Sequence, residues 1–492
     1  MEVTYKDVVN NCLIDCAHDQ IAITCSVDAK ERGGVKKLLG LSAECKVINA
    51  EAMKNEAKIT GKVCYKVIYV DKENKTCGLD YFCDFNETIT GDITPVDVLS
   101  VKSSVVDVSG RIEDDAITLT AVCDFVLTVI GKNESKAVDV AQGIYTEREM
   151  SSLVRLTSLK ENTFEVVAEE ESGSAVDKVL YFNTIPLITS VTKNDVGAVV
   201  EGVVQTEIVY IGEDTVKGKS FVTPFSEEIE ADGLADVTAT IKSNRLVLSG
   251  DQTNNVFEVQ AYVTIGGYDV NVTDVELVTD AFSTTNNLDI ENEYLPCKRF
   301  VGSQSFDFPI TSDAEIEDLS PSSTVLATPV LRVNVANAIS GQNEVTVEGL
   351  AVATILYLSE DRVNSVQVEL PFSVTEKADG ISPSDSLTVD AIITDFQANF
   401  MSGIVNLRAM LKARVNVYKT YRLKWISSIK ECEPKLDDKN GISIYYVNGF
   451  DGVWDIAKAV NMSPDEILAM NPDLETPTGE KRRVTVFRKR RK

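Results

Sequence analysis

The chain has 492 residues, 44% of them hydrophobic and 25% charged, and carries a formal net charge of −28. A chain of this length is expected to form roughly three or four domains, each able to bury its own core. The last twelve residues hold eight basic side chains and no acid, which leaves 40 basic and 76 acidic residues elsewhere, net −36. A body this acidic would repel phosphate backbones, so the composition argues against nucleic-acid binding.

The beginning of the sequence lacks the basic and apolar regions of a signal peptide. No apolar run approaches the roughly 18 residues that a membrane span needs. We therefore expect no membrane span and a protein retained in the cytosol. The basic tail at 488–492 would suit an acidic partner, an anionic lipid surface or peptidoglycan carboxylates, or it is simply a chain end.

The ten cysteines are unevenly distributed, and only Cys297 and Cys432 follow position 123. The others are Cys12, Cys16, Cys25, Cys45, Cys64, Cys77, Cys83 and Cys123. None forms a CxxC, and the only histidine is His18. Zinc sites rely on paired Cys or Cys/His spacings, so we predict no metal site and no cofactor. We expect the cysteines to be reduced thiols that fill core positions, Cys64 among them. Cross-linking of exposed thiols stays open.

An apolar strand recurs three times, as GKVCYKVIYV, GVVQTEIVYI and GLAVATILYL. Each copy begins with Gly (Gly61, Gly202 and Gly349), and these glycines are 141 and 147 residues apart. Each also has a Tyr and a following Phe, namely Tyr69, Tyr210, Tyr357, Phe85, Phe225 and Phe372. Domain-sized spacing indicates a tandem array. A glycine inside a strand predicts a bulge or a close backbone approach, and the aromatic residues are expected to pack in cores.

Three repeats follow from this spacing, at 1–142 (cysteine-rich), 143–280 and 281–430. Runs rich in Val, Ile and Thr alternate with turns about every ten residues, which predicts an all-β sandwich or small barrel in each repeat. Periodicity does not separate these two architectures. The second and third repeats begin with similar pairs, Tyr145-Thr146 and Phe282-Ser283.

A charged linker is predicted at 431–440, followed by a different kind of unit at 441–487. A short strand, two helices and a closing strand are expected there. The first helix contains Trp454, expected to be a core residue, and has Asp451 as a potential cap. The second helix begins after Ser463, which starts a Ser-x-x-Glu capping box and precedes a proline.

This unit resembles a LysM domain, the peptidoglycan- and chitin-binding module. The likeness rests on three motifs: Tyr-x-Val (Tyr445, Val447), Asp-x-x-Trp-x-Ile-Ala (Asp451, Trp454, Ile456, Ala457) and Leu-x-x-Asn-Pro-x-Leu (Leu468, Asn471, Pro472, Leu474). It implies a glycan- or partner-binding groove between two loops, with Phe450, Asp451, Gly452, Met470, Asn471, Pro472 and Asp473 as the candidate residues. The usual Gly-Asp-Thr reads Phe450-Asp451-Gly452 here, which lacks the hydroxyl and favours protein recognition.

The β repeats look like the SPOCS domain (DUF3794). The layout of SPOCS repeats followed by LysM is similar to the SipL and stage VI sporulation protein D group of spore coat morphogenetic proteins. The resemblance implies a protein of the mother-cell cytoplasm that attaches the spore coat to the forespore surface. It also implies two kinds of partner: a coat-basement ATPase of the stage IV sporulation protein A type and other coat proteins.

No GxSxG, HExxH or P-loop motif occurs, and one histidine does not support a catalytic triad. We therefore predict no catalytic residues and no enzyme, and a cell-wall hydrolase is disfavoured. Two functions remain: a coat scaffold whose exposed strand edges bind partners or other copies of the chain, and an adaptor that binds peptidoglycan through N-acetylglucosamine.

Overall fold

The protein is mainly β, as predicted. The computed structural model describes residues 2–114, 116–250, 254–315, 323–401, 404–435, 441–447, 451–472, 474 and 482–488. Within these ranges the only α-helices are α1 (Val453–Val460) and α2 (Pro464–Met470), and neither is long or apolar enough to cross a membrane. None of the hydrogen-bonded sheets in the described part closes on itself.

The first 141 residues form two three-stranded antiparallel sheets, ordered β1-β6-β5 and β2-β3-β4. The strands are β1 (Val3–Asp28), β2 (Lys37–Met53), β3 (Glu56–Val70), β4 (Thr76–Thr90), β5 (Val98–Glu113) and β6 (Ala116–Ala141). The first strand pairs with the last, and the apolar faces of the two sheets enclose one core.

The same pairing order recurs twice more along the chain. The second set is β7 (Tyr145–Ser158), β8 (Asn162–Glu171), β9 (Lys178–Lys193), β10 (Ala198–Gly212), β11 (Thr215–Ile229), β12 (Leu234–Gly250) and β13 (Asn255–Phe282). The third is β14 (Asn286–Glu315), β15 (Thr324–Ala327), β16 (Arg332–Ser340), β17 (Glu344–Ser359), β18 (Arg362–Lys377), β19 (Ser386–Met401) and β20 (Ile404–Pro434). Again the last strand pairs with the first, as β13 with β7 and β8, and β20 with β14. We call the three sets units 1, 2 and 3.

The recurrent glycine lies in the middle strand of each β2-β3-β4-type sheet, opposite the recurrent phenylalanine. A Cβ on Gly202 would lie 2.3 Å from Phe225 Cζ and 2.5 Å from the Leu187 carbonyl oxygen. Gly61 and Gly349 are equally crowded, and the neighbouring strand has a bulge next to each of the three glycines. The prediction of a bulge or close backbone approach is confirmed.

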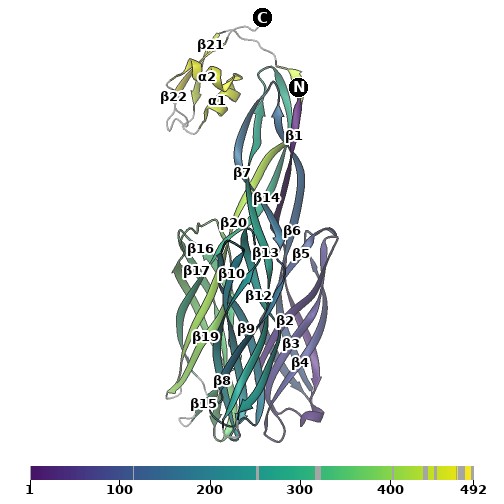
Figure 1. The fold of residues 1–492 in the computed structure, drawn as a ribbon, viewed down its shortest axis with the longest axis vertical. Helices are drawn as coiled ribbons and strands as arrows, with labels where there is room; N and C mark the ends of the chain where they lie inside the picture. The colour runs from purple at the N-terminus through teal and green to yellow at the C-terminus, as the bar shows by residue number, and fades with distance from the viewer. Residues whose placement is uncertain are drawn as a thin grey trace.

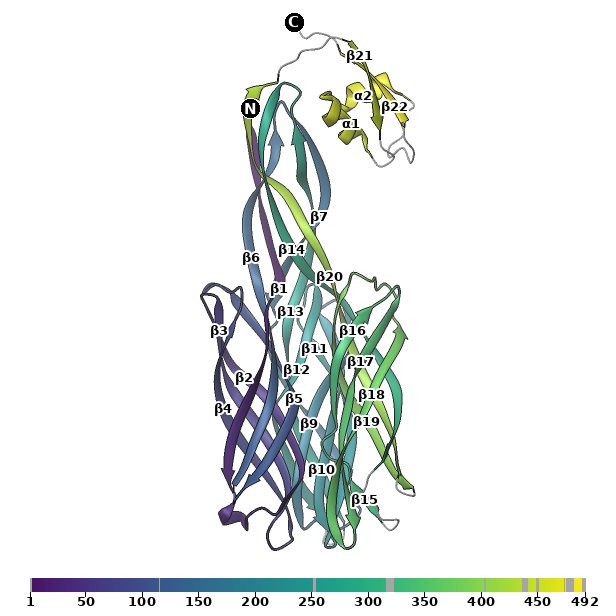
Figure 2. The same cartoon turned by 180° about the vertical axis from the view of Figure 1, so that it is seen from behind.

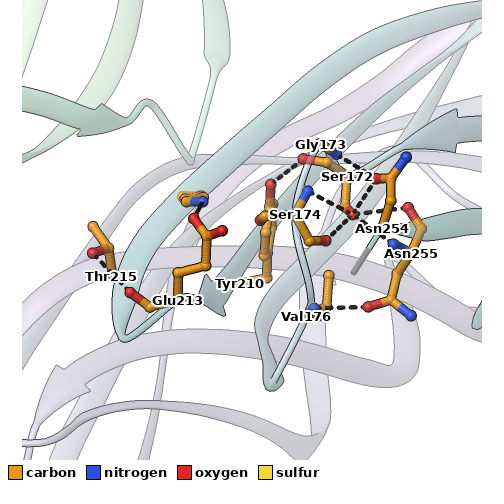
Figure 3. A network of polar contacts seen from close by, with 10 residues as sticks. Ser172, Gly173, Ser174, Val176, Tyr210, Glu213, Thr215, Asn254 and Asn255 are labelled. Atoms are coloured by element: carbon orange, nitrogen blue, oxygen red, sulfur yellow. Dashed lines mark hydrogen bonds and ion pairs between the residues drawn. The ribbon is translucent and has the colours of Figure 1, made fainter. Parts of the chain in front are cut away.

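The recurrent aromatic residues are buried core residues, as predicted. Phe85 packs against Phe125 with ring centroids 5.7 Å apart, and units 2 and 3 have similarly tilted pairs. The Tyr210 hydroxyl donates to the Ser172 carbonyl oxygen at 2.7 Å. Figure 3 shows this bond beside the contacts of Ser172 with Asn254 and Asn255, which fix the chain at this end of unit 2.

The middle strands are buried on both faces, because the three units pack around a common axis. Ile68, Val209 and Leu356 each stand seven positions after the recurrent glycine, and all three belong to one buried cluster. The opposite face of each strand contacts the core of its own unit. This double burial explains why apolar residues occur on both faces of the recurrent strand rather than only at alternate positions.

The first and last strands of each unit continue beyond the lobes into a narrow stalk (Figures 1 and 2). There the β1/β6, β7/β13 and β14/β20 pairs enclose a second apolar core, which includes Val8, Leu277 and Trp425. β20 continues to Pro434, into the stretch predicted as a linker. The stalk ends beside the small C-terminal unit.

Candidate interaction site in the C-terminal unit

The C-terminal unit has the strand–helix–helix–strand order that the sequence predicts. β21 (Gly441–Val447) pairs antiparallel with β22 (Arg482–Arg488), and α1 and α2 lie between them in sequence. Its core contains the buried side chains of Val447, Ile456, Ala457, Val460, Ile467, Val484 and Val486. These residues come from all four elements, so the short helices are stabilised mainly by packing.

The helix starts are fixed by local hydrogen bonds. Ser463 Oγ accepts from the Glu466 amide at 3.1 Å, and Glu466 Oε2 accepts from the Ser463 amide at 3.2 Å, which confirms the predicted capping box. The prediction of Asp451 as the cap of α1 is wrong. Gly452 is the N-cap residue, and its amide donates to Asp455 Oδ2 at 2.8 Å.

Among the predicted groove residues, Phe450 and Asp473 lie outside the described residues. Asp451 and Gly452 precede α1, whereas Met470 ends α2 and packs against the unit's core. The Asn471 amide is occupied within the unit: Nδ2 donates to the Ile467 and Thr485 carbonyl oxygens, each at 3.0 Å, and Oδ1 accepts from the Thr485 amide at 3.1 Å.

Asn471 therefore joins the end of α2 to β22. Its side chain builds the loop rather than presenting a free donor to a ligand. Pro472 is exposed next to it. Whether these loops form a glycan groove stays a prediction.

The C-terminal unit docks on the stalk, which no sequence motif indicates, and Asp280 is the centre of that contact. Asp280 Oδ2 accepts from Trp454 Nε1 at 3.0 Å, and Oδ1 accepts from Lys458 Nζ at 2.8 Å. Directly after α1, Asn461 Nδ2 donates to the Thr284 carbonyl oxygen at 3.1 Å. One face of α1 is thus held by the end of β13 and the residues after it.

Aromatic packing adds an apolar part to this interface. The Phe282 ring lies edge-on to Trp454 with centroids 4.9 Å apart and stacks on Tyr145 at 5.2 Å. Phe282 is buried and belongs to the same cluster as the core of the C-terminal unit. Trp454 packs against the core of the C-terminal unit, as predicted, and its half-buried ring also contacts the stalk.

The two carboxyl groups at this interface, Asp280 and Glu147, have pKa values shifted in opposite directions. Burial disfavours ionised Asp280, but the hydrogen bonds from Lys458 and Trp454 outweigh it and lower the pKa of this carboxyl. Burial, followed by the neighbouring charges of Asp280 and Asp455, raises the pKa of Glu147. The contact therefore favours one ionised carboxylate with its cation. Asp280 belongs to no sequence motif. Its position two residues before the Phe282-Ser283 pair is the one sequence feature that could have marked it as a candidate.

The remaining candidates from the sequence are His18 and the cysteines. Among the described residues, no group of three or more His, Cys, Asp or Glu side chains is placed to hold a metal. His18 Nε2 lies 2.7 Å from Asp124 Oδ1 on the surface of unit 1, with 61% of its side chain exposed. Buried thiols occur where predicted, at Cys45, Cys123 and Cys297, whereas Cys64 is half-buried and Cys432 is exposed.

Comparison with known proteins identifies one part of the chain. A family model described as "SipL, SPOCS domain" matches residues 330–401, which cover β16 to β19 of unit 3. This stretch is similar to a SPOCS domain. The match includes the recurrent Gly349 and Phe372, and it indicates a sporulation-related protein. No curated protein and no solved structure matches the chain.

Proposed function

We propose that this protein is a non-catalytic morphogenetic scaffold of the spore coat, acting in the mother-cell cytoplasm at the forespore surface. The observation that carries the proposal is the SPOCS match in unit 3. The recurrence of the same strand order in units 1 and 2 supports three SPOCS-like repeats at 1–142, 143–280 and 281–430, although only the third contains the matched residues.

The C-terminal unit is, in this proposal, a LysM domain that binds protein. Its element order and its three motifs support the LysM identity. The use of the Asn471 amide within the unit, together with Gly452 in place of the usual hydroxyl residue, favours a protein ligand over N-acetylglucosamine. The proposed partner is a coat-basement ATPase of the stage IV sporulation protein A type.

A three-lobed body suits such a scaffold. In this proposal a partner extends an edge strand of one of the open sheets by β-augmentation. The stalk places the C-terminal unit at the far end of the molecule from the lobes (Figure 1). One protein could then bind coat proteins at its lobes and the basement layer at its tip. Peptidoglycan binding is the alternative function for the same unit.

Co-sedimentation with purified sacculi, beside capture on the immobilised ATPase, separates these functions. We expect full-length protein to be captured by the ATPase and to stay in solution with sacculi. Asp451→Ala should reduce capture, and Val196→Ala, at a distant site that is 88% exposed, is the matched control. Sedimentation with sacculi that Asp451→Ala abolishes, without ATPase capture, would instead support the peptidoglycan adaptor.

A further inference from the structure

Two half-buried cysteines of unit 1 meet between its sheets. Cys25 lies on β1 opposite Leu119, and Cys83 lies on β4 opposite Val63. Laterally paired residues of a sheet point to the same face. Leu119 and Val63 are both fully buried in the unit 1 core, so both thiols are directed into the space between the sheets. Both side chains pack against this core, and Cys83 contributes to the raised pKa of Cys25, which indicates that the two thiols are neighbours.

The pair spans a seam of the unit. β1 and β4 are the facing edge strands of the two sheets and lie side by side, but no hydrogen-bonded ladder joins them in the described residues. One link across the seam is the Tyr65 hydroxyl, which donates to the Ile23 carbonyl oxygen at 2.5 Å. A covalent bond between Cys25 and Cys83 would fasten the two sheets at this seam.

Packing alone does not require a thiol here. Cys83 is paired with the residue two positions after Gly61, and the corresponding residues of units 2 and 3 are Thr223 and Leu370. The same place in the fold therefore accepts an ordinary hydroxyl or aliphatic side chain.

We propose that Cys25 and Cys83 form a redox-active dithiol, which a small-molecule disulfide oxidises to a disulfide that staples β1 to β4. Burial, with Cys83 beside it, raises the pKa of Cys25 to about 12, so this thiol stays protonated at neutral pH. The thiolate is the nucleophile in disulfide exchange, and the reaction therefore starts at Cys83.

Two exchange steps complete the oxidation. The Cys83 thiolate attacks the small-molecule disulfide, forms a mixed disulfide and releases one small thiol. Cys25 then loses its proton and attacks the Cys83 sulfur, which releases the second small thiol and leaves the Cys25–Cys83 bond. The protein dithiol is oxidised by two electrons, and the reagent is reduced to two thiols.

A second thiol pair provides the matched control. Cys45 and Cys123 are a second neighbouring pair in the same core, but Cys123 is fully buried and Cys45 is 8% exposed. Because exchange requires access for the reagent, this pair should remain reduced in the folded protein. Cys45→Val removes it and leaves the Cys25–Cys83 pair intact.

The experiment uses full-length protein, purified reduced and then treated with oxidised glutathione. Remaining thiols are alkylated after unfolding, and the chain is cut with a protease that cleaves before aspartate. Cys25 then lies in fragment 19–27 and Cys83 in fragment 80–83, each without another cysteine. We expect a linked 19–27/80–83 species that is lighter than the two thiol fragments together by two hydrogens, in wild type and Cys45→Val.

Cys25→Val and Cys83→Val should each lack the linked species, and their circular dichroism should remain that of wild type. Oxidation should raise the melting temperature of wild type and of Cys45→Val, but not that of Cys25→Val or Cys83→Val. Full alkylation of both fragments in folded, oxidised wild type would overturn the proposal. Links of Cys25 or Cys83 to any other cysteine, or glutathione left on Cys83 as a stable mixed disulfide, would also overturn it.

Discussion

Replacing Gly202 by alanine tests whether the recurrent glycine is a packing requirement. The added Cβ would lie 2.3 Å from Phe225 Cζ and 2.5 Å from the Leu187 carbonyl oxygen. The ring can turn away, but the carbonyl belongs to the neighbouring strand of the same sheet, so the sheet itself must shift. Overpacking of this kind costs about 1–3 kcal/mol, and we expect the upper half of that range.

Hydrogen exchange of β9–β11 is a suitable assay, because the stability of one unit in a large protein is not given by a single unfolding transition. A loss of about 2–3 kcal/mol corresponds to exchange that is roughly 30- to 150-fold faster. Gly266→Ala is the control: it lies in β13 of the same unit, and its Cβ would meet only Glu161 Cγ at 3.7 Å. Equal exchange in the two variants would refute the packing argument.

Three further predictions concern polar contacts. Asp280→Asn should weaken docking of the C-terminal unit by about 1 kcal/mol, a small loss because its partner Lys458 is half-exposed. Hydrogen exchange at α1 should then become faster. If the two residues act as a pair, adding Lys458→Met to Asp280→Asn should change this exchange rate little. Because the pKa of Asp280 is lowered, this contribution is present at neutral pH and disappears as the pH falls through the folded pKa. Burial raises the pKa of Glu207 to about 7, so the stability of unit 2 should fall by up to about 3 kcal/mol as the pH rises from 4.5 to 7. Hydrogen exchange at β10, corrected for the intrinsic pH dependence of exchange, should lack this slope in Glu207→Gln, and an unchanged slope would contradict the assignment. Tyr210→Phe should cost about 1 kcal/mol in unit 2 by leaving the Ser172 carbonyl oxygen without this donor, and a variant with wild-type exchange at β10 would show that the bond is dispensable.

Local sequence patterns predict the fold class and the position of several strands and helices. Strand periodicity and turn residues predict a β protein, and the spacing of Gly61, Gly202 and Gly349 locates the middle strand of each unit. The capping box at Ser463 locates α2 because its hydrogen bonds join residues three apart. Such features depend on neighbours in sequence, and a single chain displays them directly.

Long-range features were not predictable in this way. The stalk depends on strands such as β6 and β20 continuing past their lobes, and nothing within one strand tells how far its partner extends. The docking of Trp454 on Asp280 joins residues 174 positions apart, so neither contains a signal for the other. The predicted groove residues depend on the resemblance alone. Asn471 shows the consequence, because its side chain bonds within the fold instead of facing a ligand.

The common axis explains why three similar units need three different sequences. Five positions after the recurrent glycine stand Lys66, Glu207 and Thr354, all buried on the axis-facing side of their strands. Glu207 Oε1 accepts from the Leu331 amide of unit 3 at 3.1 Å, Oε2 accepts from the Tyr181 hydroxyl at 3.2 Å, and the charge of Lys66 from unit 1 favours its ionised form. Three identical residues could not provide this arrangement, since three carboxylates or three ammonium groups would repel one another in a low-dielectric site. A single chain can place an ammonium group, a carboxyl group and a hydroxyl group at equivalent positions, so each unit has one place around the axis. Exchanging Lys66 and Glu207 should therefore destabilise the lobes even though their composition is unchanged, and hydrogen exchange of β3 and β10 would measure the loss.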